Sequence, residues 1–435
     1  MSVSSRTSTP SSTQDGSQTK PGDAFYGWRI VAVCFLTHCL TVGTVFYAFG
    51  VFFHPLSEHF GWTRAQISWG FSFASIAGAL LAPVLGRIVD EYGPKPVQIF
   101  GAAMLGLGYL VLAGVESLWQ YYAAMGLCVA AGSTALGPVS SNTAVARWFV
   151  RRRGRALGIS TAGISMGGVI FVPLTHLLIE GLGWRGAFVA IAAIVVVVGV
   201  PPIALWMRRS PEELDLLPDG DVPRGPLDIR AIQAEVERSM TAREAMRGRD
   251  FWLIAIAFAL TISGLSAILL HQIPYLIDQG MEPAIASWLL GATAGVGVVG
   301  KLGFGWLLDR FNERRVILFC FILQAVGIGL LFFAARRWVL VLYVLVYGYA
   351  MGGNATLHAT TVGKVFGRLH YGAIAGRMSP IIVGLQSAGV PFVGWVHDRT
   401  GSYAPAFWTV IVASIVAAGC IWNVRFPAGR EQDTL

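Results

Sequence analysis

The chain has 435 residues, of which 54% are hydrophobic and 13% are charged, and its mean hydropathy is +0.61. Soluble domains carry about 25% charged residues, so this composition argues against a soluble protein and predicts one that is embedded in a membrane. The formal charge of +8 does not indicate nucleic-acid binding, because the basic residues are spread over short connections between apolar runs.

The five cysteines fall inside apolar runs, without CxxC spacing or a neighbouring histidine ligand pattern. We therefore expect buried free thiols, with neither a disulfide framework nor a metal site, and no cofactor. These cysteines are Cys34, Cys39, Cys128, Cys320 and Cys420.

Residues 1–24 are rich in Ser, Thr, Gly and Gln and lack the apolar stretch of a signal peptide, so we expect a disordered cytoplasmic tail. From Tyr26 onward, about twelve stretches are long enough to cross a hydrocarbon core of roughly 30 Å. The predicted spans are 26–53, 64–89, 96–115, 118–148, 156–181, 184–207, 250–278, 283–308, 316–335, 338–366, 373–397 and 402–425. The expected fold class is an all-α membrane protein with twelve transmembrane helices.

One long hydrophilic stretch, residues 208–249, divides these spans into an N-terminal six-helix bundle, 25–207, and a C-terminal six-helix bundle, 250–425. Residues 426–435 are expected to form a second cytoplasmic tail. The sequence Thr241-Ala-Arg-Glu244 predicts a capping box before the second bundle. Apolar residues at roughly helical spacing also predict an amphipathic helix on the inner membrane surface. These are Leu227, Ile229, Ile232, Val236 and Met240.

The two halves carry the same pattern about 219 residues apart. Ser68-Trp69 and Gly86-Arg-Ile-Val-Asp90 in the first half match Ser287-Trp288 and Gly305-Trp-Leu-Leu-Asp309 in the second. Secondary transporters are built from such repeats, with a substrate cavity between the two bundles. We therefore expect a transporter rather than an enzyme, and a monomer, because two bundles make a complete pathway in one chain.

Lys and Arg residues predict the orientation in the membrane. With the N-terminus inside, the inner connections carry about eighteen Lys and Arg residues and the outer connections about five. Because positively charged loops stay on the cytoplasmic side, we expect both termini in the cytoplasm and a multi-pass protein of the inner or plasma membrane.

The connections after the second and eighth spans resemble the signature of the major facilitator superfamily, Gly-x-x-x-Asp-Arg-x-Gly-Arg-Lys. Gly86 and Asp90 match it in the first half, and Gly305, Asp309 and Arg310 match it in the second. The resemblance implies the major facilitator fold and a cytoplasmic latch at these residues, because glycine lets helices touch and an Asp can bind a helix N-terminus. Glu91 occupies the usual Arg position of the first copy, so we expect this latch to be weakened or rerouted.

Four further segments resemble the monocarboxylate porter group and its bacterial relatives, which include oxalate/formate antiporters. They are Tyr26-Gly27-Trp28, Val51-Phe52-Phe53, Gly61-Trp62-Thr63-Arg64 and Arg147-Trp148-Phe149. In animal members, a lysine of the first helix takes part in proton coupling, and an Asp and an Arg of the eighth helix serve coupling and carboxylate binding. This chain has Tyr47, Gly297 and Lys301 at the corresponding positions. The resemblance therefore implies that Lys301 binds a carboxylate, without the family's own coupling residues.

A physical argument also favours Lys301 as a binding residue. A charge inside a transmembrane helix costs at least about 2.5–3.5 kcal/mol and persists mostly where it faces a cavity or a partner. The alternative is that the four-carbon side chain reaches the cytoplasmic interface, which would make Lys301 a surface residue.

Other polar residues near mid-depth are candidates for orienting the substrate or moving a proton. Each has an alternative as a packing residue, whose interhelical bond contributes about 0.6 kcal/mol. Histidine can exchange a proton near neutral pH and so could replace the missing coupling residues. The substrate-binding candidates are His38, Tyr47, Asn354 and Gln386, and the proton-coupling candidates are His38, His358 and His271, of which His271 could also gate entry.

The expected function is alternating-access, proton-linked transport of small organic monocarboxylates such as lactate or pyruvate. The glycine-rich runs 163–168 and 291–297 do not indicate nucleotide binding, because they lack the preceding strand and the Gly-Lys-Ser/Thr of a phosphate loop. The expected partners are a small carboxylate, a proton or counter-anion, and the lipid bilayer. One alternative is a carboxylate antiporter of the oxalate/formate type, which a second intramembrane cation would favour; Arg377 lies near the cytoplasmic end. A non-transporting membrane sensor on a transporter scaffold is the other alternative.

Overall fold

A computed structural model describes residues 25–220 and 239–426. Within these ranges the chain is almost entirely helical and contains no β-strand, which confirms the all-α prediction. Both predicted tails and the predicted amphipathic helix around Ile229 and Val236 lie outside the described residues.

The first half consists of the following helices. They are α1 (Gly27–Val42), continued by η1 (Gly43–Tyr47), η2 (Ala48–Phe52) and α2 (Phe53–Phe60); α3 (Arg64–Tyr92); α4 (Pro94–Ala113); α5 (Leu118–Ala123), η3 (Ala124–Val129), α6 (Ala130–Leu136) and α7 (Pro138–Trp148); and α8 (Arg153–Trp206). After the short turns η4 (Pro211–Leu214) and η5 (Pro218–Gly220), the second half contains α10 (Ala242–Arg247), α11 (Arg249–Asp278), α12 (Pro283–Arg310), α13 (Glu313–Leu331), α14 (Arg337–Phe366), α15 (Tyr371–Thr400) and α16 (Ala404–Trp422).

The described residues contain 11 helices that are long and apolar enough to cross a membrane, and one of them, α8, is two spans. Its 54 residues would extend roughly 80 Å as a single helix, which is far more than a bilayer requires. Gly183 interrupts it with φ 71° and ψ 169°, a backbone conformation that only glycine adopts readily. The described residues therefore contain twelve spans, the number that the sequence predicts.

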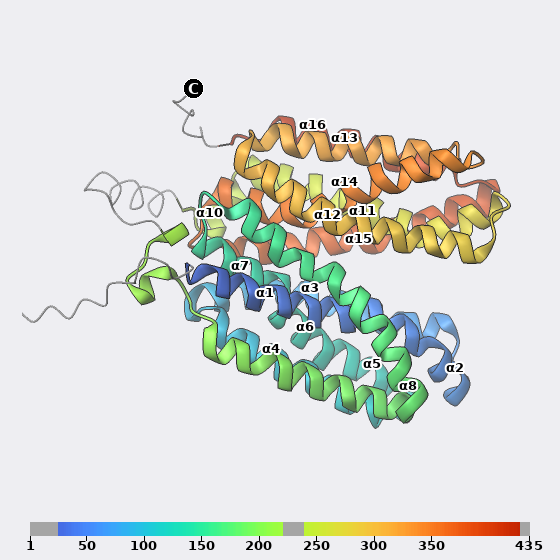
Figure 1. Cartoon of the computed structure of the whole chain (residues 1–435), viewed down its shortest axis with the longest axis horizontal. Helices are drawn as coiled ribbons and strands as arrows, with labels where there is room; N and C mark the ends of the chain where they lie inside the picture. The colour runs from blue at the N-terminus through green and yellow to red at the C-terminus, as the bar shows by residue number, and fades with distance from the viewer. Residues whose placement is uncertain (1–24, 221–238, 427–435) are drawn as a thin grey trace, which may run out of the picture.

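The helices form two bundles that lie side by side. In Figure 1, the helices from α1 to α8 form the lower bundle, and those from α11 to α16 form the upper one. The boundary between them is made chiefly by α3 packed on α15 and by the first part of α8 packed on α12. The predicted capping box is confirmed, since the Thr241 amide donates to the Glu244 carboxylate at 2.8 Å and the Glu244 amide donates to the Thr241 hydroxyl at 3.3 Å.

Each bundle is joined internally by a buried polar network between its first, third and fourth spans. In the first half, the hydroxyls of Thr37 and Ser141 lie 2.8 Å apart, and the Gln98 amide donates to Ser141 at 3.1 Å. In the second half, the Gln324 amide donates to the Thr261 carbonyl at 3.0 Å, and the Asn354 amide donates to Gln324 at 3.1 Å. Asn354, a predicted substrate-binding residue, is thus turned toward α13 inside its own bundle.

The two bundles touch at one end and separate toward the other. We call the end where α3 finishes at Tyr92 and α12 finishes at Arg310 the latch end, and the opposite end the open end. At the latch end, glycines bring the two backbones into contact, so that an added Cβ would lie 2.0 Å from Gly372 O at Gly86 and 2.3 Å from Gly305 O at Gly154.

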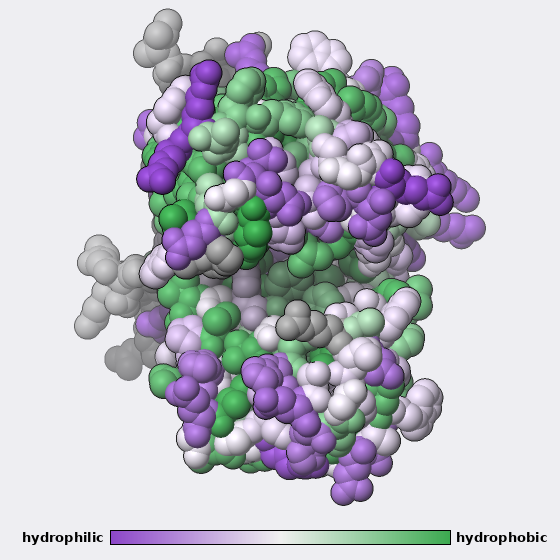
Figure 2. Space-filling model, turned by 90° about the vertical axis from the view of Figure 1, so that its right-hand side faces the viewer, coloured by the Kyte–Doolittle hydropathy of each residue, from purple (hydrophilic) through white to green (hydrophobic). Residues whose placement is uncertain are grey.

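Farther along the boundary helices, the space between the bundles widens. An added Cβ would meet nothing within 4 Å at Gly291 and Gly295 of α12 or at Gly384 of α15. Figure 2, which views the open end, shows a deep hollow between the upper and lower bundles. The protein is therefore closed at the latch end and open at the other.

We expect Gly183→Ala to lower the thermal unfolding midpoint in detergent, because a Cβ at φ 71° and ψ 169° costs about 1–3 kcal/mol. Gly181→Ala is the matched control, since Gly181 is two residues earlier in the helix and an added Cβ also meets nothing within 4 Å there. Its unfolding midpoint should stay the same or rise slightly. Equal destabilisation by both substitutions would show that the break at Gly183 is not needed.

Candidate functional site

The first latch contact joins the end of α3 to the beginning of α15. The Asp90 carboxylate accepts hydrogen bonds from the backbone amides of Gly372 at 3.1 Å and Ala373 at 2.7 Å, which are free at the start of that helix. Arg147 pairs with the same carboxylate at 3.1 Å and also donates to the Leu369 carbonyl across the boundary. A negative charge on a helix N-terminus is stabilising, so this contact holds the bundles together.

The second latch contact repeats the first in the other half. The Asp309 carboxylate, at the end of α12, accepts from the backbone amides of Gly154 at 2.8 Å and Arg155 at 3.0 Å, at the start of α8. The predicted latch residues Gly86, Asp90, Gly305 and Asp309 therefore all lie at the contact between the bundles. Arg310 lies elsewhere, with its guanidinium over the Trp306 ring of its own helix at 4.8 Å.

The segment that follows α8 is attached to both bundles. The Asp219 carboxylate accepts from the backbone amides of Val150 at 3.0 Å, Arg151 at 2.8 Å and Arg152 at 3.1 Å, in the first bundle. Glu212 pairs with Arg368, which precedes α15, at 2.8 Å. We call Glu212, Asp219 and the residues between them the linker bracket. The linker bracket therefore connects the two bundles at the latch end.

The charge of Glu212 depends on its surroundings at the latch end. Burial raises the pKa of the Glu212 carboxyl, but the Arg368 guanidinium and hydrogen bonds, including one to Ser210, outweigh this effect and hold its pKa below its usual value. Glu212 is therefore ionised at neutral pH, and its pairing with Arg368 weakens only as the pH falls through that lowered value.

A layer of polar side chains crosses the boundary farther from the latch end. The Lys301 ammonium of α12 is 5% exposed and donates to the Ser165 hydroxyl of α8 at 2.9 Å. The hydroxyls of Thr161 and Thr356, of α8 and α14, lie 2.9 Å apart. Lys301, Ser165 and their neighbours lie 7 to 12 residues from the latch ends of their helices, or roughly 10–18 Å, which is near the middle of a bilayer.

Lys301 is a buried cation without a negative partner in the residues that the structure describes, where no carboxylate pairs with it. Buried charges are normally paired, so an ammonium that is bonded only to a hydroxyl within the described residues is unusual. Its burial also shows that it does not reach the membrane surface, which was the alternative raised by the sequence.

His38 of α1 adjoins this polar layer. Its Nδ1 lies 2.8 Å from the Cys34 carbonyl and 3.2 Å from the Ser160 hydroxyl, while its buried Nε2 has no hydrogen-bond partner. Because a carbonyl can only accept, we assign the proton of the neutral imidazole to Nδ1, which leaves Nε2 with a free lone pair. His38 and Lys301 are close enough for their charges to interact.

The remaining predicted residues are distributed along the boundary and inside the second bundle. The half-buried Tyr47 lies over Gly168, one turn of α8 closer to the open end than Ser165. Gln386 donates to the Ser266 hydroxyl at 2.7 Å, which joins α15 to α11. His358 packs on Phe258, with ring centroids 5.0 Å apart.

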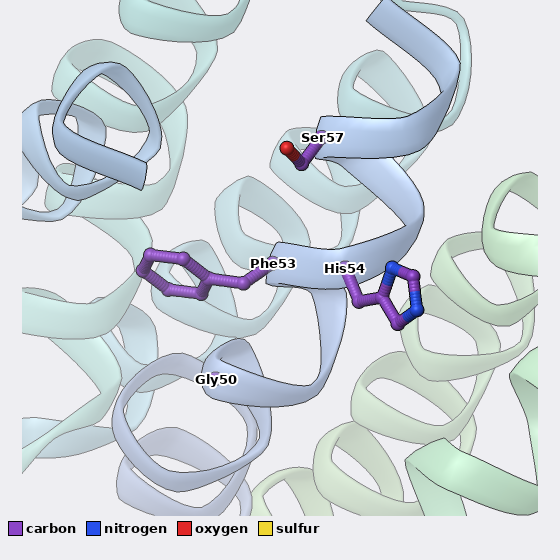
Figure 3. A pocket seen from close by; sticks show the side chains of 4 residues that line it. All are labelled: Gly50, Phe53, His54 and Ser57. Carbon is purple, nitrogen blue, oxygen red and sulfur yellow. The ribbon is translucent and has the colours of Figure 1, made fainter. Parts of the chain in front are cut away.

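His271 lies toward the open end of the second bundle, with its Nε2 3.1 Å from the Val390 carbonyl. On the other bundle, a pocket of about 510 Å³ lies at η2 and α2. Figure 3 shows the side chains that line it together with Gly50, namely Phe53, His54 and Ser57. The π-helical turn η1 and the 3₁₀ turn η2 replace regular α-helix next to this pocket, and such irregular turns are frequent at functional sites.

Sequence reasoning missed the α8 hydroxyls of this polar layer, which are Ser160, Thr161 and Ser165. Ser165 follows Thr161 by four residues and Ser160 by five, so the three hydroxyls lie along one side of the helix, which was a usable signal. Within the described residues, no group of three or more His, Cys, Asp or Glu side chains is placed to hold a metal ion.

These features define a class of protein: a multi-pass membrane transporter with two related bundles, a gate between them and a polar site near mid-membrane. The chain belongs to the Major Facilitator Superfamily, whose family model matches residues 34–376 and 252–433. This confirms the family resemblance of the signature at Gly86–Asp90 and Gly305–Asp309.

Relatives of the chain are monocarboxylate transporters, which also confirms the narrower resemblance. Monocarboxylate transporter 12-B of Danio rerio is 28% identical over 425 residues, covering 93% of this chain and 88% of that protein. Monocarboxylate transporter 13 of Rattus norvegicus is 26% identical, covering 92% and 89%. Among solved structures, the MFS proton:xylose symporter XylE bound to 6-bromo-6-deoxy-D-glucose superimposes with a TM-score of 0.72 at 16% identity, over 92% of this chain and 96% of that one, which supports the fold alone.

We expect Asp309→Asn to open the latch end more often. The substitution removes the negative charge that accepts from the two α8 amides, which lowers the free energy that favours the closed latch end by about 1–2 kcal/mol. The ratio of closed to open molecules then falls roughly tenfold. The measurement is the labelling rate of Thr161→Cys, a buried boundary position, by a maleimide applied from the latch side. Arg310→Gln is the control, because Arg310 is exposed and lies outside the latch. Identical labelling rates in both backgrounds would contradict a gating role for Asp309.

Proposed function

We propose that the chain transports small organic monocarboxylates, such as lactate or pyruvate, by alternating access, together with a proton. We further propose that the latch end faces the cytoplasm. Loops at that end carry Arg151, Arg152, Arg208, Arg314 and Arg315, and positively charged loops remain inside. The conformation described above is then open to the outside.

The proposal rests mainly on the environment of Lys301. An ammonium that is buried at the boundary and bonded only to a neutral hydroxyl offers a strong site for one carboxylate. Because lysine lacks the two-pronged geometry of arginine, neighbouring groups must orient the substrate. Ser165 and Tyr47 adjoin the same stretch of α8 and are placed to do so. The names of the relatives, monocarboxylate transporters, support the same substrate class.

The proposed proton coupling rests on two neighbouring groups, the Lys301 ammonium and the unpartnered Nε2 of His38. Two neighbouring cations repel each other, so a proton on His38 and the charge of Lys301 oppose one another. A carboxylate bound at Lys301 offsets that repulsion and favours the proton. By linkage, the proton favours the carboxylate equally, so the two bind and are released together.

Release on the other side requires the bundles to separate at the latch end. Lys301 bonds to Ser165 in the opposite bundle, so that its ammonium must exchange this hydroxyl for the carboxylate or for water as the bundles move. Opening must also break the contacts of Asp90 and Asp309 with the helix N-termini of α15 and α8. Transport therefore requires these latch contacts to break and to form again in each cycle.

We expect Lys301→Ala to lose at least about 90% of the uptake of a labelled monocarboxylate into liposomes, because the anion then has no positive partner in a low-dielectric site. Lys301→Arg should retain part of the uptake, and Lys95→Ala, which removes a lysine at the latch end, should retain all of it. The panel includes lactate, pyruvate and oxalate. Unchanged uptake by Lys301→Ala would overturn the proposed site, and oxalate uptake in exchange for formate would favour the antiporter alternative.

We expect His38→Gln to abolish stimulation of uptake by an inward proton gradient while preserving exchange of labelled for unlabelled monocarboxylate, because exchange needs no net proton movement. His358→Gln is the matched control, since its Nε2 is also buried without a partner but its ring packs inside the second bundle. Loss of the gradient response in the His358 variant instead would transfer the coupling role to that residue.

A further inference from the structure

A groove between α11 and α16 opens on the outer surface of the second bundle, away from the boundary site. Its volume is about 730 Å³. The lining residues are Arg249, Trp252, Leu253 and Ile256 on α11, Val416, Gly419 and Cys420 on α16, and Asn423 at the C-terminal end of α16. Both sets recur at intervals of three and four residues, so each is one continuous helix face, and the groove runs along the helix axes.

The groove is polar at one end and apolar along the rest. Arg249 begins α11 at the latch end, and Asn423 lies just beyond the end of α16, so these two polar residues share the end at the membrane surface. Ile256 and Val416 lie about 10 Å deeper, at seven residues of helical rise. This order of polar and apolar groups matches that of a phospholipid, with its headgroup at the surface and its acyl chain inside.

Arg249 supplies a positive charge at the polar end. Its side chain is 58% exposed, with one hydrogen bond of 3.3 Å to the Asn423 carbonyl and a carboxylate oxygen of Asp250 3.9 Å away. Asp250 also accepts from the Arg425 backbone amide at 3.1 Å, so it is shared. A guanidinium has five N–H donors in a planar fork that fits phosphate oxygens, and the hydrogen bond to the Asn423 carbonyl uses only one of those of Arg249.

The rest of the groove is lined by exposed apolar side chains. Trp252 is 45% exposed, Ile256 41% and Val416 51%, and together they form a surface that only a lipid chain would cover in a bilayer. Gly419 keeps the middle of the groove open, because an added Cβ there would meet nothing within 4 Å. Basic pockets between transmembrane helices at the cytoplasmic surface are suited to anionic lipid headgroups.

We propose that this groove binds one anionic phospholipid, with its phosphate at Arg249 and an acyl chain between Trp252 and Val416. The proposal is independent of the substrate of the boundary site. It places a lipid on α11, the first helix of the second bundle, and directly beside α10, whose exposed Arg243 and Arg247 add positive charge at the same end. An anionic headgroup there offsets like charges that otherwise repel one another.

The test is native mass spectrometry of the full-length protein in nonionic detergent, titrated with phosphatidylglycerol or with phosphatidylcholine of the same chains. We expect phosphatidylglycerol to bind at least about fivefold more tightly, as one favourable arginine near the surface would give. Arg249→Gln should remove that preference. Gly419→Leu places a side chain in the groove at a position where an added Cβ meets nothing within 4 Å, and it should weaken binding of both lipids.

Two matched variants serve as controls. Gly329→Leu adds the same side chain at another open glycine, on α13, and should leave lipid binding unchanged. Arg315→Gln removes an exposed arginine at the same end and should keep the preference for phosphatidylglycerol. Equal binding of both lipids by the wild type, or insensitivity to both Arg249→Gln and Gly419→Leu, would overturn the proposal. So would a lipid site that appears only when residues 427–435 are deleted, since the tail would then occupy the groove.

Discussion

The structure depends on two carboxylates that each bind the N-terminus of a helix in the opposite bundle. Asp90 binds α15 and Asp309 binds α8, and neither contact forms unless the bundles approach within backbone contact distance. Glycines at Gly86, Gly154 and their partners allow that approach. The first amides of a helix have no partner within that helix, so each carboxylate binds at the helix N-terminus and not elsewhere along it. This fixes the position of the two bundles relative to each other at the closed end.

The two halves share the latch but differ in the transport site. Gly305 corresponds to Gly86 in the repeat, so the counterpart of Lys301 is Ala82, which packs against Gly376. The cation is therefore present in one half only, and its hydroxyl partner Ser165 comes from the other. Duplication accounts for a symmetric gate, whereas a single buried charge makes the site between the bundles asymmetric.

Sequence patterns predicted the spans, the latch carboxylates and Lys301, because hydropathy, a repeated Gly and Asp spacing and an intramembrane charge are strong local signals. Other residues depend on contacts that no local pattern encodes. Ser165 is an ordinary small residue in an apolar helix, and only its distance to Lys301 reveals its importance. The sequence offered Asn354 equally as a substrate-binding residue, but in the structure its side-chain amide donates a hydrogen bond to Gln324 of α13. The linker bracket could not be predicted either, because Asp219 and Glu212 lie in a hydrophilic stretch that resembles an ordinary turn. Only their contacts with the Arg151 amide and with Arg368 distinguish them.

The linker bracket contacts both bundles, and its two ends respond differently when the bundles rotate. Asp219 fixes one end to the first bundle through three backbone amides, whereas the pair of Glu212 with Arg368 spans the boundary. Rotation of the bundles must therefore break or stretch the Glu212–Arg368 pair. A fluorescent domain inserted between Glu212 and Asp219 would act as a wedge and change the motion that it was meant to observe.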